Sequence, residues 1–334
     1  MGSNDFEAFL DDRTDGKDYI SVLPRSIKRR IQALKKLQID GINIEAQFYE
    51  RVHQLEAEFA PMFNALHEKR RAIVMGTHEP TDEEADFPIL HSCTEDEIKQ
   101  MEFATAPEPA QPTKGIPRFW LHLLKSADHV GEMVMEHDEP ILQHLIDITC
   151  DVDTTPDSYT LTFHFEPNDY FYQTQLKKRY MLQIGPNPDE IFEYDGPITV
   201  GAKGTEIKWK EGKNVTQKIV KKKEQKKTRN ASRFITKSVK TDSFFNFFDT
   251  PFTNKRIGTN DSELDPEERE LLQADFEIGL VFRDQIIPRA VLFYTKEAVN
   301  DNFMSFDDAE DEDEVEEEID DEIDTTGDES DRND

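Results

Sequence analysis

Four histidines with regular spacing are the first candidates for chemistry. His122, His129, His137 and His144 recur at steps of seven or eight residues through one region of predicted helices. A zinc hydrolase site needs two histidines four residues apart on one helical turn, and neither HExxH nor a cysteine cluster accompanies these side chains. The spacing therefore indicates ordinary surface or core histidines and no metal site.

The other chemistry-bearing motifs are incomplete. The segment GAKGT (residues 201–205) has two glycines but no Lys-Ser/Thr pair at P-loop spacing, which favours a turn. Neither a GxSxG nucleophile motif nor a dinucleotide fingerprint occurs. The carboxylates of EHDEP (residues 136–140) could form an acid–base pair, but 71 Asp and Glu residues supply many such pairs by chance. The sequence predicts a protein that is not an enzyme and uses no cofactor.

One strongly basic run lies in a very acidic chain. The run is KKKEQKKTRN (residues 221–230), whereas the whole chain has a formal net charge of −31. Such runs are typical of nucleic-acid patches or nuclear localisation signals. Because nucleic acids are bound by neutralising their phosphates with cations, the overall charge argues against direct high-affinity nucleic-acid binding. It favours strongly basic protein partners.

The C-terminal segment concentrates this acidity. Residues 301–334 contain 19 Asp or Glu against one Arg, and the rest of the chain still carries a net charge of −13. The tail is either a solubilising disordered extension or a polyanion that competes with DNA for basic proteins. The acidity of the rest of the chain favours the second interpretation, because solubility needs less charge. The candidate binding carboxylates are Asp307, Asp308, Glu310, Asp311, Glu312, Asp313, Glu314, Glu316, Glu317, Glu318, Asp320, Asp321 and Glu322.

A long amphipathic helix is the first element expected to position these charges. After Pro24, apolar residues recur every three or four positions, with Gly41 skipped, over a helix of roughly 45 residues. A seam of about 65 Å is too long for a compact domain of the same chain to cover, which favours a second copy over packing across its own domain. Pro61 is expected to kink or end the regular helix. The predicted dimerisation residues are Ile27, Ile31, Leu34, Leu37, Ile44, Phe48, Val52, Leu55, Phe59 and Met62.

The remaining elements predict an α+β fold. Strand-like runs between residues 148 and 209 favour an antiparallel sheet with helices packed on one side. The basic run is expected at the far end of a β-hairpin, and SFFNFF (residues 243–248) is expected in the core or at a docking contact. The predicted regions are a disordered acidic N-terminus (1–20), the long helix (21–70), an accessory subdomain with linker (71–113), the α+β domain (114–300) with its hairpin (214–240), and a disordered acidic tail (301–334).

The compartment is expected to be intracellular. Two cysteines form no CxxC pair or disulfide framework, no basic start precedes an apolar core, and no apolar run approaches the ~18 residues of a membrane helix. We therefore expect a soluble protein without membrane contact.

Several stretches, in order, resemble the nucleosome assembly protein family of histone chaperones. They are LPRSIKRRIQALKKLQ, IEAQFYERVHQLE, EKRRAIV with EPTDEE, KGIPRFWL, EHDEPILQHL, SFFNFFDTP and LQADFEIGLVFRDQIIPRAVLFYT before an acidic tail. The insert after EKRRAIV favours the longer branch of the family over its SET-like relatives. The likeness spans roughly residues 20–300.

This resemblance implies an earmuff-shaped homodimer in which an antiparallel helix pair joins two α+β domains. It implies that an acidic concave surface and the tails bind both core-histone pairs, the dimer-forming and the tetramer-forming one, without enzymatic activity. Nucleosome assembly and exchange would follow from shielding histones from non-nucleosomal DNA contacts. Apolar residues between Ile27 and Leu37 would act as an export signal, although the dimer would bury them.

The resemblance also implies that the basic run is a nuclear localisation signal recognised by an import receptor, so that the protein would shuttle between cytoplasm and nucleus. Two other interpretations stay open, a nuclear transport scaffold and a SET-like phosphatase-inhibitor or signalling adaptor. The signal residues would be Lys221, Lys222, Lys223, Lys226, Lys227 and Arg229.

Overall fold

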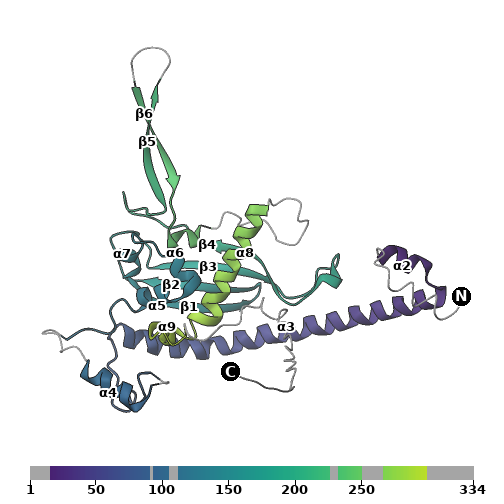
Figure 1. The fold of residues 1–334 in the computed structure, drawn as a ribbon, viewed down its shortest axis with the longest axis horizontal. Coiled ribbons are helices and arrows are strands. Elements are labelled where there is room, and N and C mark those ends of the chain that lie inside the picture. The colour runs from purple at the N-terminus through teal and green to yellow at the C-terminus, as the bar shows by residue number, and fades with distance from the viewer. Residues whose placement is uncertain (1–15, 91–92, 105–111, 226–231, 250–265, 299–334) are drawn as a thin grey trace, which may run out of the picture. The chain divides into compact units, whose positions relative to one another are not determined.

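The computed structural model describes residues 16–90, 93–104, 112–225, 232–249 and 266–298, drawn in colour in Figure 1. The predicted acidic N-terminus is described only from residue 16 onward, and the whole tail, including Asp307 to Glu322, lies outside the described residues. The same holds for Lys226, Lys227 and Arg229 at the tip of the predicted hairpin.

The predicted long helix is present as α3 (Arg25–Val74), which follows the short α2 (Gly16–Val22). Pro24 occupies the position before its first turn. The helix does not end at Pro61, one of the two outcomes expected there, because it continues through this residue to Val74. Proline removes one helical hydrogen bond, and polar contacts of Asn64 and Arg70 with the domain hold the turns that follow.

A four-stranded antiparallel sheet forms the centre of the domain, as predicted. Its strands are β1 (Leu145–Thr154), β2 (Asp157–Phe165), β3 (Gln175–Gln183) and β4 (Ile198–Gly204), in the order β1-β2-β3-β4. The segment GAKGT is therefore not a turn, because residues 201–204 belong to β4. A Cβ on Gly204 would lie 2.0 Å from the Phe248 carbonyl oxygen, so this glycine permits a close approach between backbones.

The predicted hairpin is also present, as a second sheet of two strands. Strands β5 (Gln217–Gln225) and β6 (Ser232–Lys240) pair antiparallel, with Lys222 opposite Ile235. Figure 1 shows this hairpin projecting beyond the four-stranded sheet. Lys221, Lys222 and Lys223 lie on β5, next to the undescribed tip.

Short helices cover one face of the sheet (Figure 1). Three of them precede the sheet in sequence and the others follow the hairpin, which agrees with the predicted α+β class. Among the described residues they are α5 (Phe119–Ser126), α6 (Asp128–Met133), α7 (Glu139–Leu142), the 3-10 helix η2 (Phe244–Phe248), α8 (Pro266–Leu280), the π-helix η3 (Val281–Ile286) and α9 (Ala290–Tyr294).

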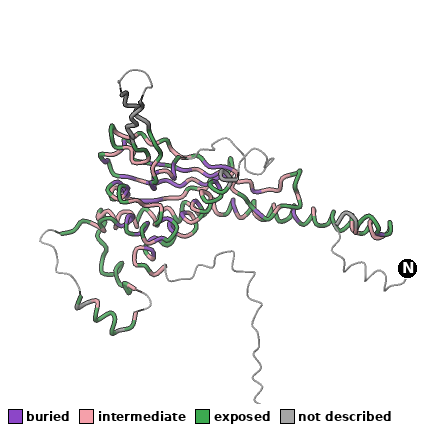
Figure 2. Tube along the Cα trace, turned by 45° about the horizontal axis from the view of Figure 1, so that its top comes forward, coloured by how far each residue is buried: buried purple, intermediate pink, exposed green. Residues whose placement is uncertain are grey.

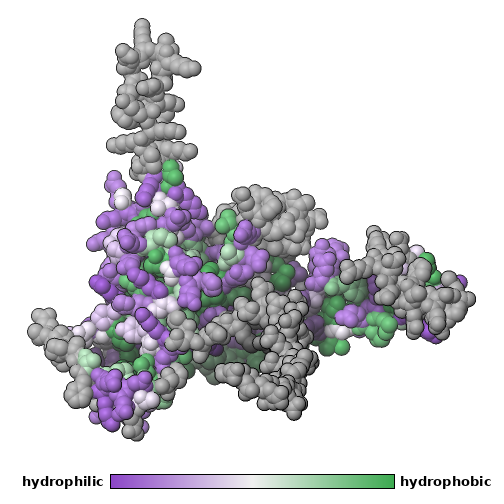
Figure 3. All heavy atoms as spheres, in the orientation of Figure 1, coloured by the Kyte–Doolittle hydropathy of each residue, from purple (hydrophilic) through white to green (hydrophobic). Residues whose placement is uncertain are grey.

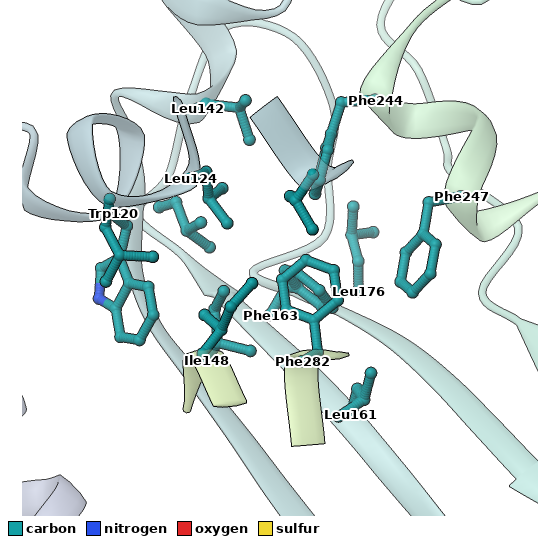
Figure 4. Packing of buried hydrophobic residues seen from close by; sticks show 14 of the residues in the cluster. Trp120, Leu124, Leu142, Ile148, Leu161, Phe163, Leu176, Phe244, Phe247 and Phe282 are labelled. Atoms are coloured by element: carbon teal, nitrogen blue, oxygen red, sulfur yellow. The ribbon is translucent and has the colours of Figure 1, made fainter. Parts of the chain in front are cut away.

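An aromatic cluster fills the space between the sheet and these helices (Figure 4). Phe163 of β2 is fully buried, and its ring centroid lies 5.1 Å from that of Phe248 and 5.1 Å from that of Phe282. All four phenylalanines of SFFNFF are buried, which confirms their prediction as core residues. Edge-to-face packing of this kind adds specific geometry to the burial of apolar surface.

The accessory segment between α3 and α5 is closed at its base by two glycines. The Ile116 amide donates to the Val74 carbonyl at 2.9 Å, and Gly76 and Gly115 both adopt positive φ, 62° and 59°. A Cβ on Gly115 would lie 2.2 Å from the Val74 oxygen. The two ends of the segment therefore meet, and its described helix is α4 (Glu95–Phe103). None of the helices within the described ranges is long and apolar enough to cross a membrane.

Candidate functional site

The apolar seam of α3 is uncovered along most of its length. Its largest side chains are exposed by between 45% and 68%. Figure 2 shows that much of this helix is exposed, in contrast to the purple strands of the sheet, and Figure 3 shows apolar residues along its projecting part. A contiguous exposed apolar surface marks an interaction site. The predicted seam residues in this class are Leu34, Leu37, Ile44, Phe48, Leu55, Phe59 and Met62, whereas Ile27, Ile31 and Val52 are half-buried.

The opposite face of α3 packs on β1 through polar contacts. The buried ring of His53 has its Nε2 3.0 Å from the Asp153 carbonyl oxygen. Asn64 donates from Nδ2 to Asp151 Oδ1 at 3.2 Å. Because these partners sit on the face opposite the exposed seam, the helix is attached to its own domain and still presents its apolar side chains outward.

A buried ion pair fixes the C-terminal part of α3. Arg70 donates from Nη1 to the Ile287 carbonyl at 2.6 Å and from Nη2 to Asp147 Oδ1 at 3.3 Å. Burial raises the pKa of Asp147 to about 6, although the nearby Arg70 opposes this shift. The guanidinium also stacks 5.1 Å from the Trp120 ring. Arg70 therefore ties the helix to β1 and to the segment after η3.

The loop between β3 and β4 makes a second attachment to the helix. Gly196 has a φ of 103°, and a Cβ there would lie 3.5 Å from the Tyr49 ring. Lys35 places its Nζ 5.5 Å from the ring of Phe192, which belongs to η1 (Ile191–Glu193). Sequence reasoning missed this support, because no periodic signal marks a loop that docks on a distant helix.

The acidic residues of EHDEP have structural partners. Asp138 is fully buried and accepts hydrogen bonds from Ser243 Oγ at 2.6 Å and from the Phe244 amide at 2.7 Å. Glu139 forms an ion pair with Lys125. Asp138 thus holds the start of η2 in place. The carboxylates of Asp138 and Glu139, which could have been considered as an acid–base pair, both make structural contacts within the fold.

A second buried charge lies beneath α8. Lys178 of β3 is fully buried and donates from Nζ to the Phe247 carbonyl and to the Asp275 carboxylate. Burial lowers the pKa of Lys178 and raises the pKa of Asp275, with each partner opposing the other's shift. Since Leu176, Lys178 and Tyr180 alternate on one face of β3, strand period alone would have placed this lysine in the core.

The four histidines behave as ordinary residues. His122, His129 and His137 are exposed and His144 is half-buried. Within the described part of the chain, no group of three or more His, Cys, Asp or Glu residues could hold a metal ion.

Comparisons with known proteins identify the fold and its family. A family model described as Nucleosome assembly protein (NAP) matches residues 29–297. The chain belongs to the nucleosome assembly protein family. It is 44% identical over 297 residues to Nucleosome assembly protein 1-like 1 of Xenopus tropicalis, a match that covers 87% of this chain and 74% of that protein.

A second relative agrees with this family assignment, and one solved structure agrees with the fold. Nucleosome assembly protein 1-like 4 of Homo sapiens is 43% identical over 315 residues, covering 88% of this chain and 81% of that protein. The solved structure of Nucleosome Assembly Protein 1 from Plasmodium knowlesi aligns with a TM-score of 0.50 at 23% identity, over 82% of this chain and 98% of that one. Nucleosome assembly proteins are histone chaperones and not enzymes.

Proposed function

We propose that this member of the nucleosome assembly protein family binds both core-histone pairs through its acidic surface and its acidic tail. The net charge of −31, together with family membership, carries the proposal. Free histones bind DNA in a salt-dependent, non-specific way, because their positively charged side chains displace counterions from the phosphates. A competing anionic protein weakens the non-nucleosomal contacts, whereas nucleosomal wrapping, with its many contacts, still prevails. This mechanism needs no covalent step.

The active form is proposed to be a homodimer. The seven seam residues with exposures between 45% and 68% support this proposal, because water contact with so much apolar surface is unfavourable. A second copy laid antiparallel on the same seam would cover it along most of α3. Two domains and two tails would then act on one histone complex, with the gain in effective concentration that linked sites provide.

The hairpin is proposed to direct the protein to the nucleus. Lys221, Lys222 and Lys223 lie on β5, and the remaining basic residues of the run follow in the undescribed tip. A basic run suits an import receptor that has acidic recognition sites. The protein would then move between cytoplasm and nucleus with its histone cargo.

A supercoiling assay with relaxed plasmid, topoisomerase and purified core histones tests the chaperone function. We expect the protein to introduce supercoils without ATP, at salt concentrations where histones and DNA alone precipitate. A nuclear transport scaffold would bind histones in the same buffer but produce no supercoils. An adaptor of the SET-like kind would do neither, and either result would contradict the proposal.

A further inference from the structure

A groove with an apolar floor lies between α6, η2 and α8. Its volume is about 520 Å³. Leu271 stands at its edge with 64% of the side chain exposed, whereas the adjacent Leu272 is only 4% exposed and packs inward. An exposed leucine beside a concave apolar surface is the arrangement that receives an apolar side chain of a ligand. The apolar lining consists of Met133, Phe247, Leu271, Leu272, Ile278 and Val281, together with Ala274.

The charged residues around this groove are mostly acidic. They comprise Glu132, Asp249, Asp275 and Glu277, with Lys240 and His129 as the basic exceptions. Lys240 lies 3.5 Å from Asp249, in a pair whose two side chains are both mostly exposed. Asp275 is already engaged by the buried Lys178. Glu132 and Glu277 form no ion pair with any described residue, so the rim retains negative charge for a ligand.

We propose that this groove binds a basic segment of a core histone that carries a large apolar side chain, with Leu271 as its principal apolar contact. The inference rests on the proposed histone binding and assigns one part of that binding to a defined groove. The rim selects basic residues by charge, and the floor selects the apolar side chain by burial. Unlike a purely acidic tail, such a site adds a contribution to affinity that salt does not screen.

Two fluorescent peptides of equal charge test this proposal with the full-length protein. Both are basic dodecamers with six Lys or Arg residues; one carries two leucines at helical spacing and the other carries serines at those positions. Anisotropy titrations are performed from low to high salt. We expect the leucine peptide to bind about tenfold more tightly, the gain from burying one leucine, with the ratio maintained as salt rises.

Two matched variants locate the effect. Leu271→Ser removes the proposed contact, whereas Leu280→Ser changes a leucine of the same helix that is 40% exposed and does not line the groove. We expect L271S to abolish the preference for the leucine peptide and to leave binding of the serine peptide unchanged, with L280S like the original protein. Methyl NMR of the unsubstituted protein gives an independent measurement, with shifts expected at Leu271 and Ile278.

Several results would overturn the proposal. These are equal binding of the two peptides, equal effects of L271S and L280S, or methyl shifts confined to other residues. A change of oligomeric state in L271S would instead place a second copy of the chain in the groove. The supercoiling assay separates this outcome from failure of the chaperone function, because a protein that assembles nucleosomes but shows no leucine preference retains the function and lacks this site.

Discussion

Arg70, near the end of α3, lies with its Nη2 3.3 Å from the Asp147 carboxylate at the start of β1. Asp147 is 1% exposed, so its carboxylate is removed from water. The pair joins two elements that are separated in sequence by the whole accessory segment and by α5, α6 and α7. This contact, with those of His53 and Asn64, sets the orientation of α3. The direction in which the exposed seam faces therefore depends on a few buried polar interactions.

Loss of the Arg70 charge is expected to destabilise the domain. Arg70→Met would leave Asp147 buried without a cationic partner, and we expect the free energy of unfolding to fall by about 3–5 kcal/mol. Arg71→Met is the matched control, since Arg71 pairs with the exposed Glu68 at 3.5 Å, and exposed pairs contribute under about 1 kcal/mol. Urea unfolding measures both, and losses of similar size would contradict the role given to Arg70.

The same carboxylate predicts a pH dependence of stability. The pKa of Asp147 rises from 3.8 to about 6 on folding, so the folded state binds this proton more tightly than the unfolded state. The contribution of Asp147 to the free energy of unfolding therefore falls as pH rises from about 4 to 6, by up to about 1.4 kcal/mol per pH unit. Asp147→Asn lacks this titration. We expect the stability of the unsubstituted protein, relative to D147N, to decline across that range and then level off; a constant difference would refute the assignment.

Charge placed on the seam is expected to separate the proposed dimer without unfolding the domain. Phe48 and Leu55 are 60% and 52% exposed in the single chain, so Phe48→Glu with Leu55→Glu costs little in the monomer and disrupts a helix pair. Sedimentation should give a monomer with an unchanged circular dichroism spectrum. The control Ile198→Glu with Val291→Glu adds the same charge at positions that are 46% and 56% exposed, off the seam. A dimer in both variants would show that the seam is not the interface.

Removal of residues 301–334 is expected to weaken histone binding without abolishing it. The shortened chain keeps a net charge of −13. We expect lower affinity and a shallower dependence of affinity on salt, because fewer charges take part. A Gly/Ser tail of equal length controls for the loss of chain. If the shortened chain binds histones with unchanged affinity, or does not bind them at all, then the prediction that both the tail and the rest of the chain contribute to histone affinity is wrong.

Substitution of the hairpin lysines is expected to prevent nuclear import. A fluorescent fusion with Lys221, Lys222 and Lys223 changed to Ser should remain in the cytoplasm. A control fusion loses the same number of charges at the exposed positions 36, 69 and 203, which are lysines spread over α3 and β4, and should enter the nucleus. Nuclear accumulation of both fusions would show that these three lysines are not needed for nuclear import.

Much of this architecture was predictable because its signals are local. Apolar residues at steps of three or four specify the helix that includes Phe48 and Leu55, whatever it packs against. Strand-like runs around the basic residues specify the hairpin, and the clustered phenylalanines of residues 244–248 specify a core segment. The acidic balance, which defines the class of partner, is a property of composition alone.

The tertiary structure decided which groups share an environment. Asp138 and Ser243 are 105 residues apart in sequence, and Lys178 and Asp275 are 97 residues apart. No local sequence pattern therefore predicts either contact. The turn expected at residues 201–205 became the strand β4 because a neighbouring strand supplies its hydrogen bonds. Likewise, Pro61 lies inside a continuous helix because contacts from distant elements hold both sides. Sequence determines which elements form and what charge they carry, whereas packing between distant segments determines which faces are buried and which remain open to a partner.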